Sequence, residues 1–199
     1  MGRIRAIETE YNGFRFRSRL EARWAVFLDA LGVRYEYEPE GFELPSGARY
    51  LPDFRVRCWG TRGHRDGPPF DLYIEVKGRM TERDAARIRE FAGARPGGAE
   101  NPTLVVGAIP PERGATDADA CGSYAGDAGV CPFNYGTVDG DDFAAFPAAH
   151  RGRFYLMGDD SNYINQDDVF SVESAYHIAR AARFEHGETP TRRSVQRRA

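Results

Sequence analysis

Residues 70–78 read FDLYIEVKG, and residues 50–54, a short distance upstream, read YLPDF. The apolar and aromatic residues at 54–59 and 70–76 predict two strands, and the stretch between them, rich in turn formers, predicts an antiparallel hairpin. Side chains two residues apart on a strand point to the same face, so Glu75 and Lys77 should emerge side by side. If Asp53 opens the first strand, its carboxylate converges on Glu75 across the hairpin.

This group of side chains has the chemistry of a divalent-metal site. The carboxylates of Asp53 and Glu75, with the backbone carbonyl of Val76, would form the oxygen-rich, incompletely filled shell in which Mg²⁺ keeps waters and takes up a substrate phosphate. Lys77 could orient or help to deprotonate a water, which suits metal-assisted hydrolysis of a phosphodiester. Taken one residue at a time, such side chains more often form an ordinary cross-strand ion pair, so the prediction rests on their combination.

The composition singles out the same place. Of the 27 basic residues one is a lysine, Lys77, and the other 26 are arginines. Lysine differs from arginine in being a compact point charge whose pKa responds readily to its surroundings. A chain that uses arginine almost everywhere else has a lysine at the position that the proposed chemistry requires.

Hydrophobic spacing and turn residues predict further elements on both sides of the hairpin. Ser18 as an N-cap, followed by apolar residues that recur every three or four positions, predicts a helix that ends at Gly32. Thr81, with Asp84 three residues later, predicts the start of a second helix. The remaining predictions are a strand at 33–38, a short hairpin of 42–44 and 48–51, a buried strand at 103–109, a strand at 153–157 and a helix at 172–184.

Pro52-Asp53 with Glu75-Val76-Lys77, preceded by a helix that carries Glu21, resembles the PD-(D/E)xK nuclease superfamily. Its compact phage and bacterial endonucleases and its RecB-like and Holliday-junction-resolvase-like branches are the most similar, and the resemblance covers about residues 14–92. It implies an α/β (α+β), restriction-endonuclease-like fold whose αβββαβ core has a central mixed sheet flanked by helices. It also implies DNA cleavage that depends on Mg²⁺ or Mn²⁺, with Asp53 and Glu75 as metal ligands and Lys77 as the catalytic lysine.

Glu21 has two interpretations. In related enzymes an acidic residue on the first helix completes the metal site, and Glu21 occupies the matching place, so the resemblance implies a catalytic or metal-assisting role. The spacing Ser18-x-x-Glu21 is also that of a capping box, in which Glu21 would only satisfy the backbone at the helix start. Both interpretations remain open on the sequence.

We expect one nuclease domain spanning 1–199, with its core at about 14–109. Residues 110–151 are rich in Gly, Ala, Asp and Pro and are long for a structureless loop, so we expect an irregular insertion there. A C-terminal strand and helix should occupy 152–186. The remainder, 187–199, carries arginine pairs and a proline and is expected to be a basic, disordered tail.

The charge distribution permits a phosphate-facing surface on a chain whose formal net charge is −3. Both ends are rich in arginine, although charge alone fits a solvated surface equally well. The candidate nucleic-acid contacts are Arg19 and Arg23 on the first helix, Arg62 and Arg65 in the hairpin tip, Arg180 and Arg183 on the last helix, and Arg192 and Arg193 in the tail.

The function expected from these features is that of a Mg²⁺- or Mn²⁺-dependent DNA endonuclease, structure-selective or nicking. The alternatives are a DNA-binding or scaffold protein of the same fold that does not cleave, and an RNA nuclease, because phosphate chemistry at the metal is the same for both nucleic acids. A homodimer would explain double-strand cuts, and repair, recombination, phage genome processing and restriction all use this core. No run of about 18 apolar residues and no secretory signal is visible, so we expect a cytoplasmic protein with no membrane partner.

Overall fold

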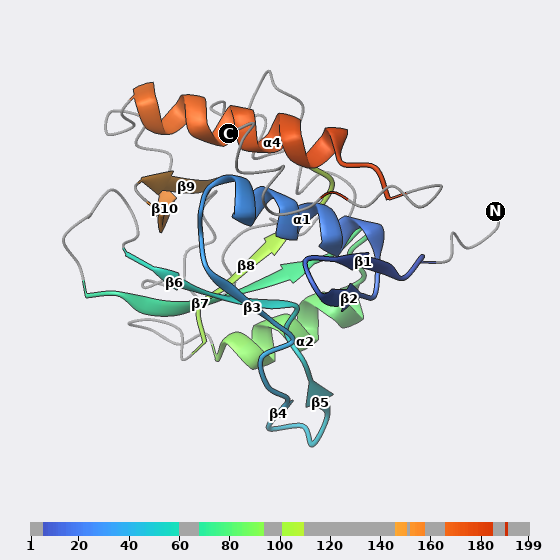
Figure 1. The fold of residues 1–199 in the computed structure, drawn as a ribbon. Helices are drawn as coiled ribbons and strands as arrows, with labels where there is room; N and C mark the ends of the chain where they lie inside the picture. The colour runs from blue at the N-terminus through green and yellow to red at the C-terminus, as the bar shows by residue number, and fades with distance from the viewer. Residues whose placement is uncertain are drawn as a thin grey trace.

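The structure, a computed structural model, describes residues 6–59, 68–93, 101–109, 146–150, 152–157, 166–184 and residue 190. Within these ranges the chain has a mixed α/β fold (Figure 1). The helices are α1 (Arg19–Ala30), α2 (Glu82–Ala92) and α4 (Gln166–Ala181). The strands are β1 (Thr9–Tyr11), β2 (Phe14–Phe16), β3 (Tyr35–Tyr37), β4 (Phe42–Glu43), β5 (Arg49–Tyr50), β6 (Phe54–Cys58), β7 (Phe70–Val76), β8 (Thr103–Val106), β9 (Phe146–His150) and β10 (Arg153–Met157).

The central element is a mixed sheet in the order β8-β7-β6-β10-β9, and β3 also pairs with β6. β6 and β7 form the predicted antiparallel hairpin, with Phe54 opposite Ile74. β8 joins β7 in parallel, which requires a crossover, and α2 lies in that connection. β3 and β10 share the other edge of β6, because β3 pairs with residues 54–56 and β10 with Cys58.

The helices lie on both faces of this sheet. α1 and α4 run side by side over one face, and α2 covers the other (Figure 1). Phe27 of α1 stacks on Tyr176 of α4 with ring centroids 4.6 Å apart, and both rings are buried. A second, smaller core lies under α2, where Phe91 packs against Tyr50 and Tyr73.

Local sequence explains where α1 and α2 begin and end. Ser18 has extended backbone angles and its side chain accepts the N–H of Glu21, as an N-cap does. Thr81 and Asp84 form the predicted capping box at the start of α2. Gly93 ends α2 in the left-handed conformation, with a φ of 62°, which a residue without Cβ adopts at low cost. The predicted short hairpin is also present as β4 and β5.

Several elements differ from the sequence predictions. An N-terminal hairpin, β1 and β2, was not predicted, although Asn12-Gly13 is typical of a type I′ turn and both residues have positive φ. Residues 146–150, placed by composition in an irregular segment, form β9, which pairs with β10. α4 begins at Gln166 instead of residue 172, and β3 and β8 are shorter than predicted. The segments 110–145 and 191–199 lie outside the described residues.

None of the helices in the described part of the chain is both long and apolar enough to cross a membrane.

Candidate active site

The hairpin of β6 and β7 brings the predicted carboxylates together at one end of the sheet. Asp53 immediately precedes β6, and Glu75 lies near the end of β7. Both residues are buried, with 2% of Asp53 and 3% of Glu75 exposed to solvent. The Val76 N–H donates to Asp53 Oδ2 at 2.7 Å, which fixes one Asp53 oxygen beside β7. The Tyr50 hydroxyl donates to Glu75 Oε2 at 2.8 Å. Both carboxylates are therefore held in defined orientations.

Lys77 lies beside Glu75, as the period of two along a strand predicts. Its Nζ is 2.5 Å from Glu75 Oε1, and its backbone N–H donates to the Val106 carbonyl. Burial opposes the charged form of Lys77, but the charge and hydrogen bond of Glu75, together with the charges of Asp53 and Asp84, outweigh it, so the pKa of Lys77 is raised. The lysine is therefore a protonated ammonium at neutral pH in this state.

The surroundings of Asp53 disfavour its ionised form. Burial first, and then the charges of Glu75 and Glu21, raise the pKa of Asp53 to about 8, although the Val76 N–H and Lys77 act in the opposite direction. A buried carboxylate in such surroundings is stabilised by any cation that approaches it. A cation bound next to Asp53 is therefore electrostatically favourable.

Glu21 makes the contacts of a cap and also acts on Asp53 through its charge. Its Oε1 accepts the Ser18 hydroxyl at 2.8 Å, and its Oε2 accepts the backbone N–H of Arg17 at 3.1 Å. The Tyr37 hydroxyl donates to the same Oε2 at 2.7 Å. Because Glu21 is close enough to raise the pKa of Asp53, capping does not remove it from the site. Its capping contacts are present, and its metal-assisting role stays a prediction.

Three residues of the site were missed by the sequence analysis. Arg17 forms ion pairs with Asp53, Nη2 to Oδ1 at 2.5 Å, and with Glu38, Nε to Oε1 at 2.8 Å. Tyr37 and Tyr50 are the phenols that hold Glu21 and Glu75, and burial followed by the contacts with those carboxylates raises the pKa of each. Tyr37 belongs to an alternating YEY strand and Tyr50 directly precedes the LPD stretch, which are the only signals that pointed to them.

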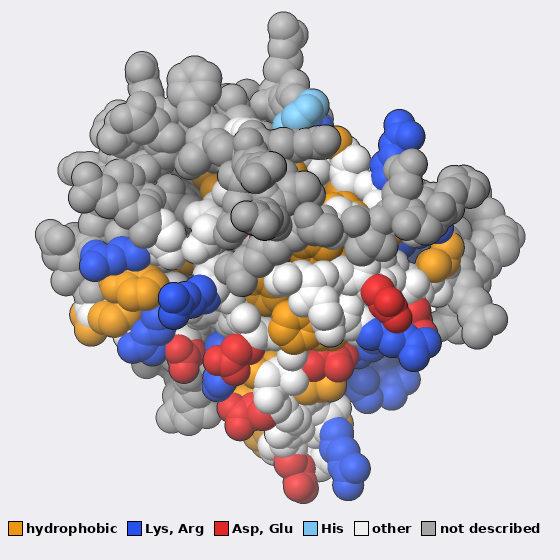
Figure 2. All heavy atoms as spheres, in the orientation of Figure 1, with side chains coloured by type: hydrophobic (Ala, Val, Ile, Leu, Met, Phe, Trp, Pro, Cys, Tyr) orange, Lys and Arg blue, Asp and Glu red, His pale blue; other side chains and the backbone are white. Residues whose placement is uncertain are grey.

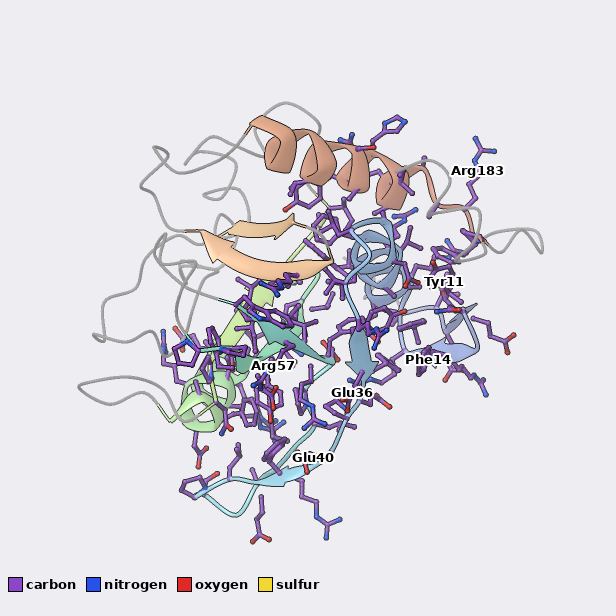
Figure 3. The ribbon with its side chains drawn as sticks, turned by 60° about the vertical axis from the view of Figure 1, so that its left-hand side comes forward. Tyr11, Phe14, Glu36, Glu40, Arg57 and Arg183 are labelled. Atoms are coloured by element: carbon purple, nitrogen blue, oxygen red, sulfur yellow. The ribbon has the colours of Figure 1, made fainter. Side chains whose placement is uncertain are left out.

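The candidate nucleic-acid contacts are only partly covered by the structure. Arg19 and Arg23 are half-buried on α1, and their Nε atoms are shielded from solvent. Arg180 is half-buried on α4, and Arg183 is exposed beyond its end, on the side of the molecule where Tyr11 lies (Figure 3). Acidic and basic side chains are interleaved on the face shown in Figure 2. Arg62, Arg65, Arg192 and Arg193 lie outside the described residues.

The side chains present fit a divalent cation that is shared with a substrate. In the described ranges, no three or more His, Cys, Asp and Glu side chains form a group that could hold a metal ion by themselves. Mg²⁺, however, is usually bound through one or two carboxylates and completes its shell with waters and substrate phosphate. Asp53 and Glu75 supply two carboxylates, and one oxygen of each already binds a cationic group, Arg17 at Asp53 and Lys77 at Glu75. The part assigned to the Val76 carbonyl stays a prediction.

No family model, curated protein or solved structure matches this chain. The resemblance to PD-(D/E)xK nucleases therefore stays a prediction.

Proposed function

We propose that this protein is a PD-(D/E)xK-type nuclease that hydrolyses phosphodiester bonds of DNA with the help of Mg²⁺ or Mn²⁺. One observation carries the proposal: two buried carboxylates, Asp53 just before β6 and Glu75 on the neighbouring β7, act on each other, and the chain's single lysine is ion-paired to Glu75. Such a group has a cost in a purely structural role, because buried like charges repel each other. A bound divalent cation would relieve this repulsion, and it would in turn bind a phosphate of the substrate.

The arrangement of elements supports the same proposal. α1, β3, β6, β7, α2 and β8 follow one another in the order helix, three strands, helix, strand, and the small β4–β5 hairpin is inserted between β3 and β6. The strands are adjacent in the order β3-β6-β7-β8, with β8 parallel to β7. This order is what an αβββαβ core requires. The additional elements β1, β2, β9, β10 and α4 surround it.

Each residue has a distinct part in the proposed reaction. A divalent cation, when bound, supplies Lewis-acid chemistry: it neutralises phosphate charge and lowers the pKa of water. Asp53 and Glu75 would hold it, and Tyr50 and the Val76 N–H keep their carboxylates oriented. Because the pKa of Lys77 is raised, its ammonium is suited to stabilise negative charge that develops on the phosphate and not to abstract a proton. The observed ion pair thus disfavours deprotonation of a water, one of the two roles considered for this lysine in the sequence analysis.

The proposal is tested by metal-dependent cleavage of supercoiled plasmid and of labelled linear, flapped and four-way-junction DNA. Asp53→Asn and Lys77→Ala should each lower the cleavage rate by about a hundredfold or more. The matched controls are Asp71→Asn, an exposed carboxylate on the same strand as Glu75 that pairs with Arg57, and Arg79→Ala, an exposed cation two residues after Lys77. Both controls should cleave at the wild-type rate.

Other outcomes discriminate between the alternatives. Binding of these DNAs without cleavage under either metal would favour the DNA-binding protein that does not cleave. Cleavage of RNA substrates only would favour an RNA nuclease. Cleavage that persists in both site variants would show that the reaction takes place elsewhere and would contradict the proposal.

A further inference from the structure

Arg17 forms an ion pair with the candidate metal ligand Asp53. One Asp53 oxygen, Oδ2, already accepts the Val76 N–H, and the guanidinium Nη2 of Arg17 binds the other, Oδ1, at 2.5 Å. Arg17 lies between the end of β2 and the N-cap of α1, so its backbone is fixed by two elements. Its own N–H donates to Glu21 Oε2 and to the Tyr37 hydroxyl. Side chain and backbone of one residue therefore contact two of the predicted site carboxylates.

The charge balance shows why a cation is needed there. The charges of Glu75 and Glu21 both act on Asp53, and Lys77 forms its ion pair with Glu75. Burial opposes the charged form of Arg17, but Asp53, Tyr37, Glu21 and Glu38 more than compensate and raise its pKa. Arg17 thus offsets the charge of Asp53 by direct contact, whereas Lys77 is paired with Glu75 and acts on Asp53 through its charge.

The surroundings of Arg17 also allow it to leave Asp53. Its side chain is 54% exposed, so the guanidinium can move toward solvent without disturbing the core. A different atom, Nε, holds Glu38 Oε1 at 2.8 Å. Glu38 is itself anchored, because its backbone N–H donates to the Asp53 carbonyl and its φ of 47° is a conformation that a non-glycine residue keeps only when its surroundings impose it. Arg17 can therefore release Asp53 and stay bound to Glu38.

We infer that Arg17 is a positioning residue that competes with the divalent cation for Asp53 Oδ1 and remains tethered to Glu38 when the cation displaces it. The inference rests on the proposed function, since it takes Asp53 as a metal ligand. It assigns to Arg17 the role of internal counter-ion for the metal-free site. A divalent cation must then replace an existing ion pair, so the competition weakens its apparent affinity.

The experiment is calorimetric titration of Mn²⁺ into the full-length protein without nucleic acid. Arg17→Gln should bind Mn²⁺ about fivefold or more tightly than wild type, within the usual range of coupling between two ligands. Without metal, Arg17→Gln should melt at a lower temperature than wild type, and Mn²⁺ should raise its melting temperature by more than that of wild type. Arg15→Gln is the matched control: Arg15 is two residues away, pairs with Glu8 at the surface and should leave Mn²⁺ affinity unchanged. A merely structural role of Arg17 would lower the melting temperature without tightening Mn²⁺ binding.

The other outcomes of the titration distinguish failure of this inference from failure of the proposed function. Equal or weaker Mn²⁺ binding by Arg17→Gln, with normal binding by wild type, would overturn the inference and leave the proposed function intact. No Mn²⁺ binding by wild type or by Arg17→Gln would overturn both. Should Arg17→Gln not fold, Arg17→Met keeps most of the side-chain length without the charge and should also bind Mn²⁺ more tightly than wild type; wild-type affinity in that variant would overturn the inference.

Discussion

Burial and like charge both act strongly on Asp53. Its pKa of about 8 in the folded protein lies far above the value of about 3.9 in an unfolded chain. Between these values the folded protein holds a proton that the unfolded chain has released, so the free energy of unfolding falls as the pH rises through about 8. We expect the melting temperature of metal-free wild type to fall by several degrees relative to Asp53→Asn between about pH 5 and about pH 9, at about 2–4 °C for each 1 kcal/mol.

Differential scanning calorimetry in a chelating buffer measures this difference. Asp71→Asn, an exposed carboxylate on β7, is the control and should follow the wild-type profile. Saturating Mn²⁺ should flatten the wild-type decline, because a bound cation favours the ionised carboxylate. Parallel profiles for wild type and Asp53→Asn would show that Asp53 does not titrate in this range.

At the residue scale, the sequence predicted the parts of the site that follow from strand geometry. Glu75 and Lys77 share a strand face, and Asp53 precedes its partner strand, so a period of two and one hairpin suffice to bring them together. Arg17 could not be found in this way. It contacts Asp53 across 36 residues, and 26 arginines give no pattern that singles out one of them. Long-range ion pairs depend on the packing of whole elements.

At the scale of elements, the start of α1 serves both the fold and the site. The Ser18 hydroxyl caps the helix and also donates to Glu21 Oε1, whereas Thr81 caps α2 through Asp84. Replacing either cap by alanine should lower the free energy of unfolding by about 1 kcal/mol, measured by urea denaturation. Only Ser18→Ala should also slow DNA cleavage, by about tenfold, since Glu21 and the nearby Arg17 lose their fixed positions.

The comparison of these two caps separates stability from function. Equal cleavage by Ser18→Ala and Thr81→Ala at equal loss of stability would show that the orientation of Glu21 is unimportant for the reaction. In that case Glu21 would retain only its capping contacts.

Elements with a complete local signal were predicted, and those without one were not. α2 has a capping box, an apolar face and a terminal glycine, and it was found. α4 was predicted to begin six residues late, because Asp167 and Asp168 interrupt the apolar spacing even though acidic residues are favourable in a first helical turn. β9 contains Pro147 and two alanines, which have low strand propensity, so its sequence does not indicate a strand. Its pairing with β10 stabilises the strand conformation instead.

For the whole molecule, the sheet separates two cores of unequal size. The larger one joins α1, α4 and the strands, and the smaller one lies under α2 and the β4–β5 hairpin. Phe27→Ala and Phe91→Ala remove a buried phenyl ring from one core each, and either should cost about 3–5 kcal/mol. Hydrogen exchange followed by mass spectrometry should show faster exchange in α1 and α4 for Phe27→Ala, and in α2, β4 and β5 for Phe91→Ala.

The pair of variants contains its own control, since each one reports on the face that the other leaves unchanged. Faster exchange over the whole chain in both variants would show that the two faces unfold as one unit. The sequence could place both helices but not this division, because which face of a sheet a helix covers depends on chain crossover and not on local spacing.

Because Lys77 is the single lysine of the sequence, an amine-specific side-chain label can report on this site alone. Reductive methylation with isotope-labelled formaldehyde keeps the charge of an amine and labels only the Lys77 side chain and the chain's terminal amino group. The side-chain signal in an NMR spectrum would come from the labelled methyl groups on Nζ, which lies beside Glu75 in the candidate site. Paramagnetic Mn²⁺ bound at the neighbouring carboxylates would broaden that one resonance, so metal occupancy could be observed directly in a spectrum with almost no overlap.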